Sequence, residues 1–273
     1  MNLAELVRLT LAEDIGLGDV TTDACVEATS IGSARIYAKE PIVVSGNDAA
    51  AEVFRQLGCE YERVAHDGAF AGGPNDDTVA TVRGRHRDLL TGERAALNFL
   101  MHLSGVATHV KRITHGTPAL RVVDTRKTTP LLRSLEKAAV RHGGGANHRF
   151  GLFDGVLIKD NHIVAAGGVQ AAVAKARSAA HPLLRVEVEV EDLAELEQAI
   201  AAGADDILLD NMDDATLTQA VAITAGRARL EISGGVSRER LPFLASLGVH
   251  RVSMGGLIHQ ARWVDLSMRI DAA

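Results

Sequence analysis

The pattern of apolar and polar positions divides the chain into two parts. Up to about residue 115, helical spacing and strand-like runs follow one another without regular alternation, which predicts a mixed α/β domain. Helices are expected at residues 2–14, 47–57 and 89–115, and strands at residues 33–44, 59–66 and 78–83. Gly92 and Gly105 are candidates for breaks in the third helix.

In the second part, short apolar strands alternate regularly with helices. The strands are expected at residues 120–124, 155–159, 184–190, 206–210, 228–232 and 250–253. The helices are expected at residues 131–142, 169–179, 193–202, 214–225 and 238–247. Continuous Val/Ile/Leu runs are typical of strands buried on both faces, so this alternation predicts a parallel sheet. Residues 263–270 alternate in polarity and either add a strand or return to the first part.

Six strands are fewer than the eight of a complete α/β barrel, so a doubly wound open sheet is the alternative to an incomplete barrel. Each of the six strands ends in, or leads into, residues that suit chemistry. In a barrel, all strand C-termini converge on one mouth, whereas an open sheet gathers its functional groups at one switch point. This placement of polar groups favours the barrel.

Charge narrows the range of ligands. The chain of 273 residues is acidic overall, with 35 Asp+Glu against 29 Lys+Arg, yet Arg and Lys are concentrated between Asp124 and His162. Such a cluster in an acidic protein predicts a pocket for a small polyanion, whereas nucleic-acid binding would favour a broadly basic face. No apolar run reaches the roughly 18 residues of a membrane span, and the N-terminal residues do not resemble a signal peptide, so we expect no membrane association and a cytoplasmic location.

Two double-glycine turns follow the last two expected strands, SGG at residues 233–235 and MGG at residues 254–256. Barrels commonly bind phosphate in the loops after their last two strands, where backbone N–H groups approach an anion closely. The alternative is that these glycines only make tight turns. Their occurrence after two consecutive late strands favours phosphate binding.

Three carboxylates are candidates for the barrel mouth. Glu187 and Glu189 point to the same face of one strand, because side chains alternate with a period of two, and Asp210 ends the next strand. Carboxylates beside a phosphate can hold Mg²⁺ directly or through water. The alternative is that these three acids only form ion pairs with the cations nearby.

The cations fall into two sets. The first lies in loops or at strand ends, where function concentrates, and consists of Arg126, Lys127, Arg149 and Lys159. The second is spaced by four on a helix, which predicts a solvated face, and consists of Arg133, Lys137 and Arg141. His148 and His162 lack the spacing of a zinc helix, so hydrogen bonding is expected of them rather than metal ligation. Arg94 reads as a surface residue of a helix.

Several long motifs resemble those of the quinolinate phosphoribosyltransferases, in the same order and spacing. They are EDIGLGDVTT, LTGERAALNFLMHLSGVAT, DTRKTTP, the Gly-rich NHR segment, IKDNH, VEVEVEDL, ILLDNM and SGG. The resemblance covers nearly the whole chain and is far more specific than a lone glycine signature. It implies an N-terminal α/β sandwich domain at residues 1–115, with residues 262–273 as candidates to join it. The second domain, at residues 116–261, would be an open, incomplete α/β barrel of the type II phosphoribosyltransferase-like kind that carries the active site.

The resemblance also implies an activity. Phosphoribose would pass from phosphoribosyl pyrophosphate to quinolinate with loss of carbon dioxide, giving nicotinate mononucleotide and pyrophosphate on the route to NAD. Mg²⁺ is the implied cofactor, held by Glu189 and Asp210 through water. The implied assembly is a homodimer or higher homo-oligomer in which Arg94 reaches the active site of a neighbouring subunit.

The roles of individual residues follow from the same motifs. Lys127, Glu189 and Asp210 would be catalytic, with the two acids facing the ribose and the metal and Lys127 nearer the pyrophosphate. The full set that would contact the substrates is Arg94, Thr125, Arg126, Lys127, His148, Arg149, Lys159, Glu189, Asp210, Ser233, Gly234, Gly235, Met254, Gly255, Gly256 and His259.

The chain departs from the family pattern in places. Members often carry Gln where Met101 or His102 stands, a small residue often replaces Ile232, and the segment commonly like GALTHS reads GGLIHQ here. The related phosphoribosyltransferases associated with molybdenum transport share the fold and many motifs, and they are the alternative for the substrate. From the residues alone, an aldolase with Lys159 as a Schiff-base nucleophile and a non-catalytic sensor of a phosphorylated ligand also stay open.

Overall fold

The computed structural model describes residues 2–73, 77–116 and 120–271 and divides into two compact units. The first comprises Met1–Arg112, Thr128–Gly144 and Gly256–Ala273, and the second comprises Ile113–Lys127 and Gly145–Gly255. The domain limits expected from the sequence, with a cut after residue 115, stay a prediction, and residues 272–273 of the expected C-terminal return lie outside the described residues.

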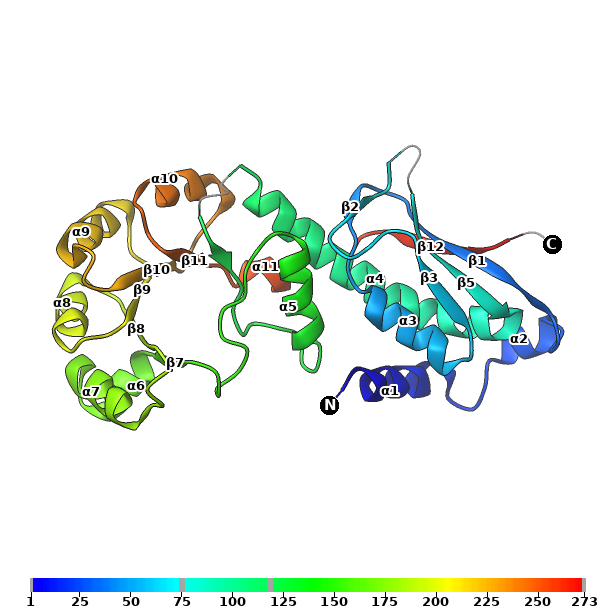
Figure 1. The fold of residues 1–273 in the computed structure, drawn as a ribbon, viewed down its shortest axis with the longest axis horizontal. Helices are drawn as coiled ribbons and strands as arrows, with labels where there is room; N and C mark the ends of the chain where they lie inside the picture. The colour runs from blue at the N-terminus through cyan, green and yellow to red at the C-terminus, as the bar shows by residue number, and fades with distance from the viewer. Residues whose placement is uncertain (1, 74–76, 117–119, 272–273) are drawn as a thin grey trace. The chain divides into compact units, whose positions relative to one another are not determined.

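The first unit is built on an antiparallel four-stranded sheet in the order β12-β1-β5-β3 (Figure 1). Its strands are β1 (Ile31–Ala38), β3 (Glu60–Arg63), β5 (Thr78–Arg85) and β12 (Leu266–Ile270), and a separate short ladder joins β2 (Ile42–Val43) to β4 (Phe70–Ala71). The helices are α1 (Leu3–Ile15), α2 (Val20–Cys25), α3 (Asn47–Gln56), α4 (His86–Thr114), α5 (Arg133–His142) and α11 (Gly256–His259). The C-terminal residues therefore add a strand to the N-terminal sheet.

Helices α3 and α4 pack their buried apolar residues against the sheet of this unit. Phe54 on α3 and Leu97 on α4 are buried with Ile36 and Val82 of the sheet in one continuous cluster. The expected strand at residues 33–44 is interrupted, because Pro41 has no N–H to donate to a ladder and the chain leaves the sheet after Ala38. Helix α2 was not expected; the side chain of Asp19 caps it by accepting a hydrogen bond from the Thr22 amide.

The second unit contains a six-stranded sheet whose pairs are all parallel, in the order β6-β11-β10-β9-β8-β7. Its strands are β6 (Val122–Val123), β7 (Val156–Ile158), β8 (Val186–Val190), β9 (Asp206–Asp210), β10 (Arg229–Ser233) and β11 (Arg251–Ser253). Its helical segments are α6 (Asp160–Ala166), α7 (Val169–Ala179), α8 (Leu193–Ala201), α9 (Asp214–Thr224), the 3₁₀ turn η1 (Arg238–Arg240) and α10 (Leu241–Ser246).

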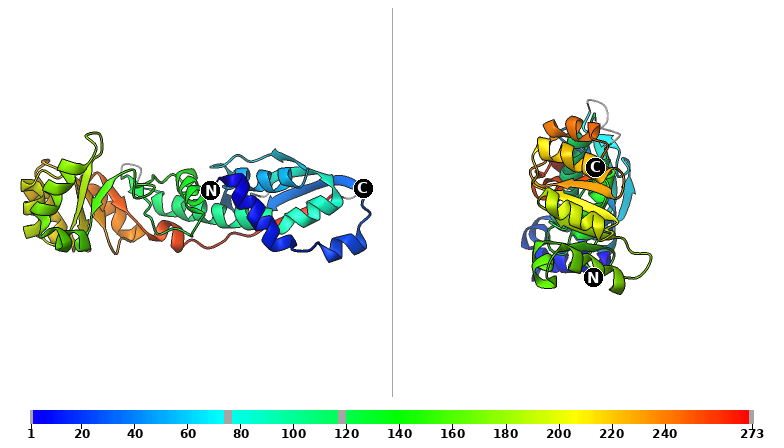
Figure 2. Two further views of the ribbon diagram at one scale, coloured as in Figure 1. Left: turned by 90° about the horizontal axis from the view of Figure 1, so that it is seen from below. Right: turned by 90° about the vertical axis from the view of Figure 1, so that its left-hand side faces the viewer.

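The strand order identifies an open barrel rather than a doubly wound sheet. Consecutive strands from β7 to β11 are neighbours, and the first strand, β6, pairs with the last, so the order never reverses in the middle. The helices lie on the outer side of the curved sheet (Figures 1 and 2). The expected fold class is confirmed. Helix α6 was missed, and the expected helix at residues 238–247 begins as the η1 turn.

Local sequence explains where the helices of this unit begin. Asp192 accepts a hydrogen bond from the Glu195 amide at the start of α8, and Asp213 accepts one from the Thr216 amide at the start of α9. A carboxylate at this position satisfies one free amide of the first turn and complements the helix dipole. Within the described residues, no helix is both long enough and apolar enough to cross a membrane.

Gly92 and Gly105 do not break α4, which continues through both. They permit close approach instead. A Cβ atom on Gly105 would lie 2.2 Å from the backbone oxygen of Arg262, and one on Gly92 would lie 2.8 Å from a side-chain carbon of Leu57. Because backbone yields less readily than a side-chain end, Gly105 is the more constrained of the two.

We expect Gly105→Ala to lower the free energy of unfolding by about 1–3 kcal/mol, because the added methyl group would force the Arg262 segment away from α4. Urea denaturation measures this difference. Gly73→Ala is the matched control, because a Cβ there meets no atom within 4 Å, and it should change stability by no more than ~0.5 kcal/mol. Equal stability of the two variants would contradict the close-approach explanation.

Candidate functional site

A buried carboxylate at the end of β6 ties together two loops of the second unit. Asp124 is fully buried and accepts hydrogen bonds from the His148 amide, at 2.9 Å, and from the Asn147 side chain, at 2.6 Å. A parallel bridge between Val123 and Ala146 continues the pairing of the same segments. The loop that carries Arg126 is thereby fixed next to the loop that carries Arg149.

The positive charge of Arg126 acts on the guanidinium of Arg149. Burial, and after it the positive charge of Arg126, holds the pKa of the Arg149 guanidinium below its ordinary value. A guanidinium nitrogen of Arg149 also donates to the backbone oxygen of Gly155 at 3.3 Å. Two guanidinium groups whose positive charges repel each other form a site that stabilises an anion with two carboxylates.

Lys159 and Glu189 form a direct ion pair of 2.5 Å between the ends of β7 and β8. Lys159 also precedes α6, where its amide donates to Nδ1 of His162 at 3.0 Å. The predicted meeting of a strand-end cation with a strand-end carboxylate therefore occurs here. The pair engages the amino group of the lysine with a carboxylate, whereas a Schiff-base nucleophile must be free to attack a carbonyl carbon.

Asp210 and the SGG turn meet at the ends of β9 and β10. Asp210 and Ser233 are partners in the strand register, and the Asn211 amide donates to the Ser233 oxygen at 3.0 Å. Gly234 has a positive φ of 80°, and a Cβ atom on it would lie 2.2 Å from the side-chain oxygen of Asn211. Glycine is therefore required here by both backbone conformation and space.

The MGG turn is anchored by its first residue. The Met254 amide donates to the Val123 oxygen at 3.0 Å, and the Met254 side chain is buried. Gly255 is the last residue of the second unit. Nearer the DTRK motif, Thr125 accepts a hydrogen bond from the Lys127 amide through its hydroxyl at 3.0 Å.

Three of the expected site residues belong to the first unit. Arg94 is exposed on α4, while Gly256 begins α11 and His259 is exposed at its end.

His102, one of the departures from the family pattern, also lies in the first unit, where its ring nitrogen is 2.8 Å from the fully buried Glu136. Burial opposes ionisation of Glu136, but hydrogen bonds from His102 and the Thr129 segment outweigh it and lower the pKa of that carboxyl.

Two expectations are corrected. The solvated face expected of Arg133, Lys137 and Arg141 is wrong for Lys137, which is fully buried, although Arg141 is exposed. Of the three carboxylates expected at the mouth, Glu187 lies deeper. It is buried and forms ion pairs with His148 and with Arg251, so the ion-pair alternative holds for this residue.

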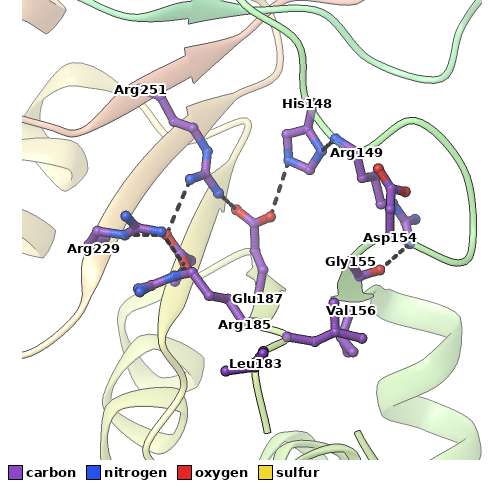
Figure 3. A pocket seen from close by; sticks show the side chains of 12 residues that line it. His148, Arg149, Asp154, Gly155, Val156, Leu183, Arg185, Glu187, Arg229 and Arg251 are labelled. Carbon is purple, nitrogen blue, oxygen red and sulfur yellow. Dashed lines mark hydrogen bonds and ion pairs between the residues drawn. The ribbon is translucent and has the colours of Figure 1, made fainter. Parts of the chain in front are cut away.

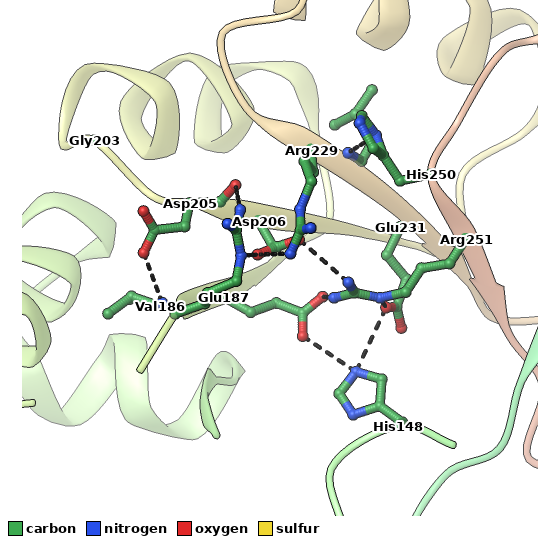
Figure 4. A network of polar contacts seen from close by, with 12 residues as sticks. His148, Val186, Glu187, Gly203, Asp205, Asp206, Arg229, Glu231, His250 and Arg251 are labelled. Carbon is green, nitrogen blue, oxygen red and sulfur yellow. Dashed lines mark hydrogen bonds and ion pairs between the residues drawn. The ribbon is translucent and has the colours of Figure 1, made fainter. Parts of the chain in front are cut away.

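Sequence reasoning missed a buried ionic network inside the barrel (Figure 4). Arg251 pairs with Glu231, with Glu187 at 2.7 Å and with Asp206 at 3.2 Å. Asp206 also pairs with Arg185 at 2.5 Å and Arg229 at 2.9 Å. The available signal was the alternation of charged and apolar residues within β8 and β10, together with two acids four residues apart in β9, because strand residues an even number apart face the same side.

A cavity of about 240 Å³ opens beside this network, toward the starts of β8 to β10 (Figure 3). Its lining is rich in arginine and contains His148 and Arg149 from the expected site. The complete lining is His148, Arg149, Asp154, Gly155, Val156, Leu183, Leu184, Arg185, Glu187, Asp206, Arg229 and Arg251.

His148, Glu187 and Glu231 offer ligand atoms within 4.8 Å of one another, a spacing that suits a metal ion. Arg251 already contacts both carboxylates, so a metal would have to displace a guanidinium that neutralises them. We therefore assign no metal to this cluster. The carboxylates expected to hold Mg²⁺, Glu189 and Asp210, stand toward the C-terminal ends of β8 and β9, and that expectation stays a prediction.

Comparison with known proteins tests the resemblance. A family model described as the quinolinate phosphoribosyl transferase C-terminal domain matches residues 105–269, and the corresponding N-terminal domain model matches residues 19–104. The chain belongs to the quinolinate phosphoribosyltransferase family. The expected recognition is confirmed.

Relatives within this family match the chain along its length. A probable carboxylating nicotinate-nucleotide pyrophosphorylase of Bacillus subtilis is 39% identical over 99% of this chain and 94% of its own, and one of Synechocystis is 43% identical over 95% and 90%. The solved nicotinate-nucleotide pyrophosphorylase of Francisella tularensis superposes with a TM-score of 0.92 at 39% identity, covering 98% of this chain and 96% of that one.

The pKa of His148 generates a test of the site that does not depend on activity. Burial opposes protonation of the imidazole, but Glu187 and Glu231 outweigh it and raise the pKa of His148 to about 9. A raised pKa stabilises the fold fully below the unfolded value of roughly 6.5, and this stabilisation is lost as pH rises through the folded value.

We expect the stability advantage of the wild type over His148→Gln to shrink by about 3 kcal/mol between roughly pH 6.5 and pH 9. Denaturation of both proteins at each pH measures the difference, so that titrations common to both cancel. A stability difference that does not vary with pH would show that the two carboxylates do not act on the imidazole.

Proposed function

We propose that the chain transfers phosphoribose from phosphoribosyl pyrophosphate to quinolinate and releases carbon dioxide, giving nicotinate mononucleotide and pyrophosphate. Family membership over the whole chain supports this reaction. The observation that carries it is the pair of mutually repelling arginines, Arg126 and Arg149, on loops joined by the buried carboxylate of Asp124. The molybdenum-transport alternative is not favoured, because the relatives and the solved structure just described are named for the pyridine nucleotide.

In this proposal the diacid is gripped by Arg126 and Arg149, with His148 and Lys159 completing the pocket. Each guanidinium matches one carboxylate with two parallel N–H donors, which fixes orientation as well as charge. Fixing both carboxylates aims the pyridine nitrogen at C1 of the sugar, and such positioning removes much of the entropic barrier of a two-substrate reaction.

The bond between C1 and the pyrophosphate oxygen then breaks as the bond from the pyridine nitrogen to C1 forms. C1 becomes electron-poor, so Glu189 or Asp210 stabilises it, while Lys127 offsets the negative charge on the leaving group. The carboxylate at the neighbouring ring carbon next leaves as carbon dioxide. Its electron pair stays on that carbon beside the cationic nitrogen, and a proton from solvent completes the product.

The sugar phosphate is assigned to the two glycine turns. Ser233, Gly234 and Gly235 would offer a hydroxyl and backbone amides, and the MGG turn with His259 would complete the site. Positive φ values of 80° and 57° at the two glycines of the SGG turn orient consecutive amides in a way that suits an anion. The GGLIHQ segment lacks the hydroxyls that flank this histidine in the family pattern, so we expect backbone amides to bear more of the phosphate charge.

Mg²⁺ is the proposed metal. Asp210 is partly exposed, and its carboxylate oxygens suit a hard cation. Glu189 already pairs with Lys159, so it would bind the metal through water. When bound, the metal would neutralise part of the pyrophosphate charge. A homo-oligomer in which Arg94 acts in the neighbouring subunit's site is also proposed, because Arg94 is exposed on α4 and belongs to a motif of the family. The cytoplasmic location stays a prediction.

We expect Arg126→Ala to lower kcat/KM for quinolinate by at least about 30-fold, because removing one partner of a charge pair costs roughly 2–5 kcal/mol. Formation of nicotinate mononucleotide and release of carbon dioxide are followed together with both substrates and Mg²⁺. Arg177→Ala, which removes an exposed arginine of α7, is the control and should retain activity. Normal quinolinate turnover by Arg126→Ala would refute the assignment of this arginine.

A mixing experiment tests the shared site. Arg94→Ala and Arg126→Ala are each expected to be nearly inactive, but a dimer with one subunit of each kind has one site with both arginines intact. Random reassortment should then restore about a quarter of wild-type activity. Mixtures that stay as inactive as their components after unfolding and refolding together would show that Arg94 acts within its own subunit.

A further inference from the structure

The imidazole of His148 is held at both nitrogens by groups of the second unit. Its Nε2 lies 3.1 Å from a carboxylate oxygen of Glu187 and 3.4 Å from one of Glu231. Its Nδ1 lies 2.8 Å from the amide nitrogen of Arg149, which donates to it when the ring is neutral. The ring therefore cannot turn without leaving a buried carboxylate and a backbone amide without these bonds, which is costly.

Glu231 is the deepest of these groups, with 1% of its surface exposed. Arg251 stabilises its charge and also reaches Glu187, so a single guanidinium holds both carboxylates behind the imidazole (Figure 4). Burial disfavours the ionised form of Glu231, but His148 and Arg251 outweigh it and lower the pKa of the carboxyl to about 2. Glu231 is therefore charged where it faces Nε2.

We propose that Glu231, together with Glu187 and Arg251, positions the diacid-binding residues. The two carboxylates hold the Nε2 edge of the His148 imidazole and so fix the ring whose Nδ1 edge lies against the backbone of Arg149. The inference rests on the proposed function, in which His148 and Arg149 contact quinolinate. In this proposal the network affects the affinity for quinolinate as well as the stability of the fold, because Glu231 acts on the substrate through His148.

The charges that face His148 come from every side of the site. Glu187 approaches from β8 and Glu231 from β10, while Arg251 on β11 contacts both of these carboxylates. Asp124 at the end of β6 accepts from the His148 amide, and Arg149 follows it in the chain. Removing the charge of Glu231 subtracts one of the two carboxylates that directly face Nε2.

The test is Glu231→Gln, which preserves shape and removes the charge. The KM for quinolinate should rise about tenfold, which corresponds to ~1.4 kcal/mol, while the KM for phosphoribosyl pyrophosphate and kcat change by less than about threefold. In protein labelled at histidine, the His148 ring signal is identified by its absence from His148→Gln. Its titration midpoint should fall by about one pH unit, because one carboxylate partner is gone.

Asp206→Asn is the matched control. It removes an equally buried carboxylate of the same network, whose ion pairs are with Arg185, Arg229 and Arg251. This variant should lower thermal stability but leave the quinolinate KM and the His148 titration near their wild-type values. Glu187→Gln should behave like Glu231→Gln, which provides a second variant if one of them folds poorly.

The outcomes separate the two claims. If wild-type protein does not convert quinolinate, the proposed function fails, and the ring titration still decides whether Glu231 acts on His148. If wild-type protein is active but Glu231→Gln and Asp206→Asn affect the quinolinate KM and the titration equally, the positioning role is overturned and the network is structural. A quinolinate-specific rise in KM with a lowered midpoint in Glu231→Gln alone supports the proposal.

Discussion

Charge buried inside a parallel barrel must be paired, and this constraint organises the second unit. Three strands bring Glu187, Asp206 and Glu231 into an interior that apolar side chains would ordinarily fill. An unpaired carboxylate there would destabilise the fold by several kcal/mol, so arginines from the starts of neighbouring strands accompany them. The pairs are connected rather than isolated, and Arg251 alone contacts all three acids. Through His148, the network continues into a loop that carries substrate-binding candidates.

Part of this architecture was predictable from the sequence alone. The six parallel strands were predictable because Val, Ile and Leu dominate them, and the open barrel was predictable because every strand leads into polar residues. The Lys159–Glu189 pair was foreseeable for the same reason, since both residues stand where strands end. Patterns of this kind depend only on residues close in the sequence, so they can be recognised without knowing which distant segments come into contact.

The rest depended on three-dimensional neighbours. Arg251 reads as the first polar residue of a short strand, and nothing near it in the chain indicates that it meets Glu187, 64 residues away. Lys137 has helical spacing typical of a surface residue, yet tertiary packing buries it completely. Gly105 reads as a helix breaker, whereas its actual constraint is the backbone of Arg262 on a distant segment. In each case, a contact between residues far apart in the sequence overrides the local preference.

The pairing of first strands with last ones has a consequence for how the polypeptide matures. β6 is hydrogen-bonded to β11, and β1 to β12, so neither sheet reaches its final membership until the end of the chain is available. Such long-range closures are slow, because the entropy lost in bringing remote segments together precedes the contacts that compensate for it. During synthesis on the ribosome, each sheet therefore keeps an unpaired strand until its C-terminal partner has been made. The six-stranded sheet is completed only when β11 pairs with β6, and the four-stranded sheet only when β12 pairs with β1.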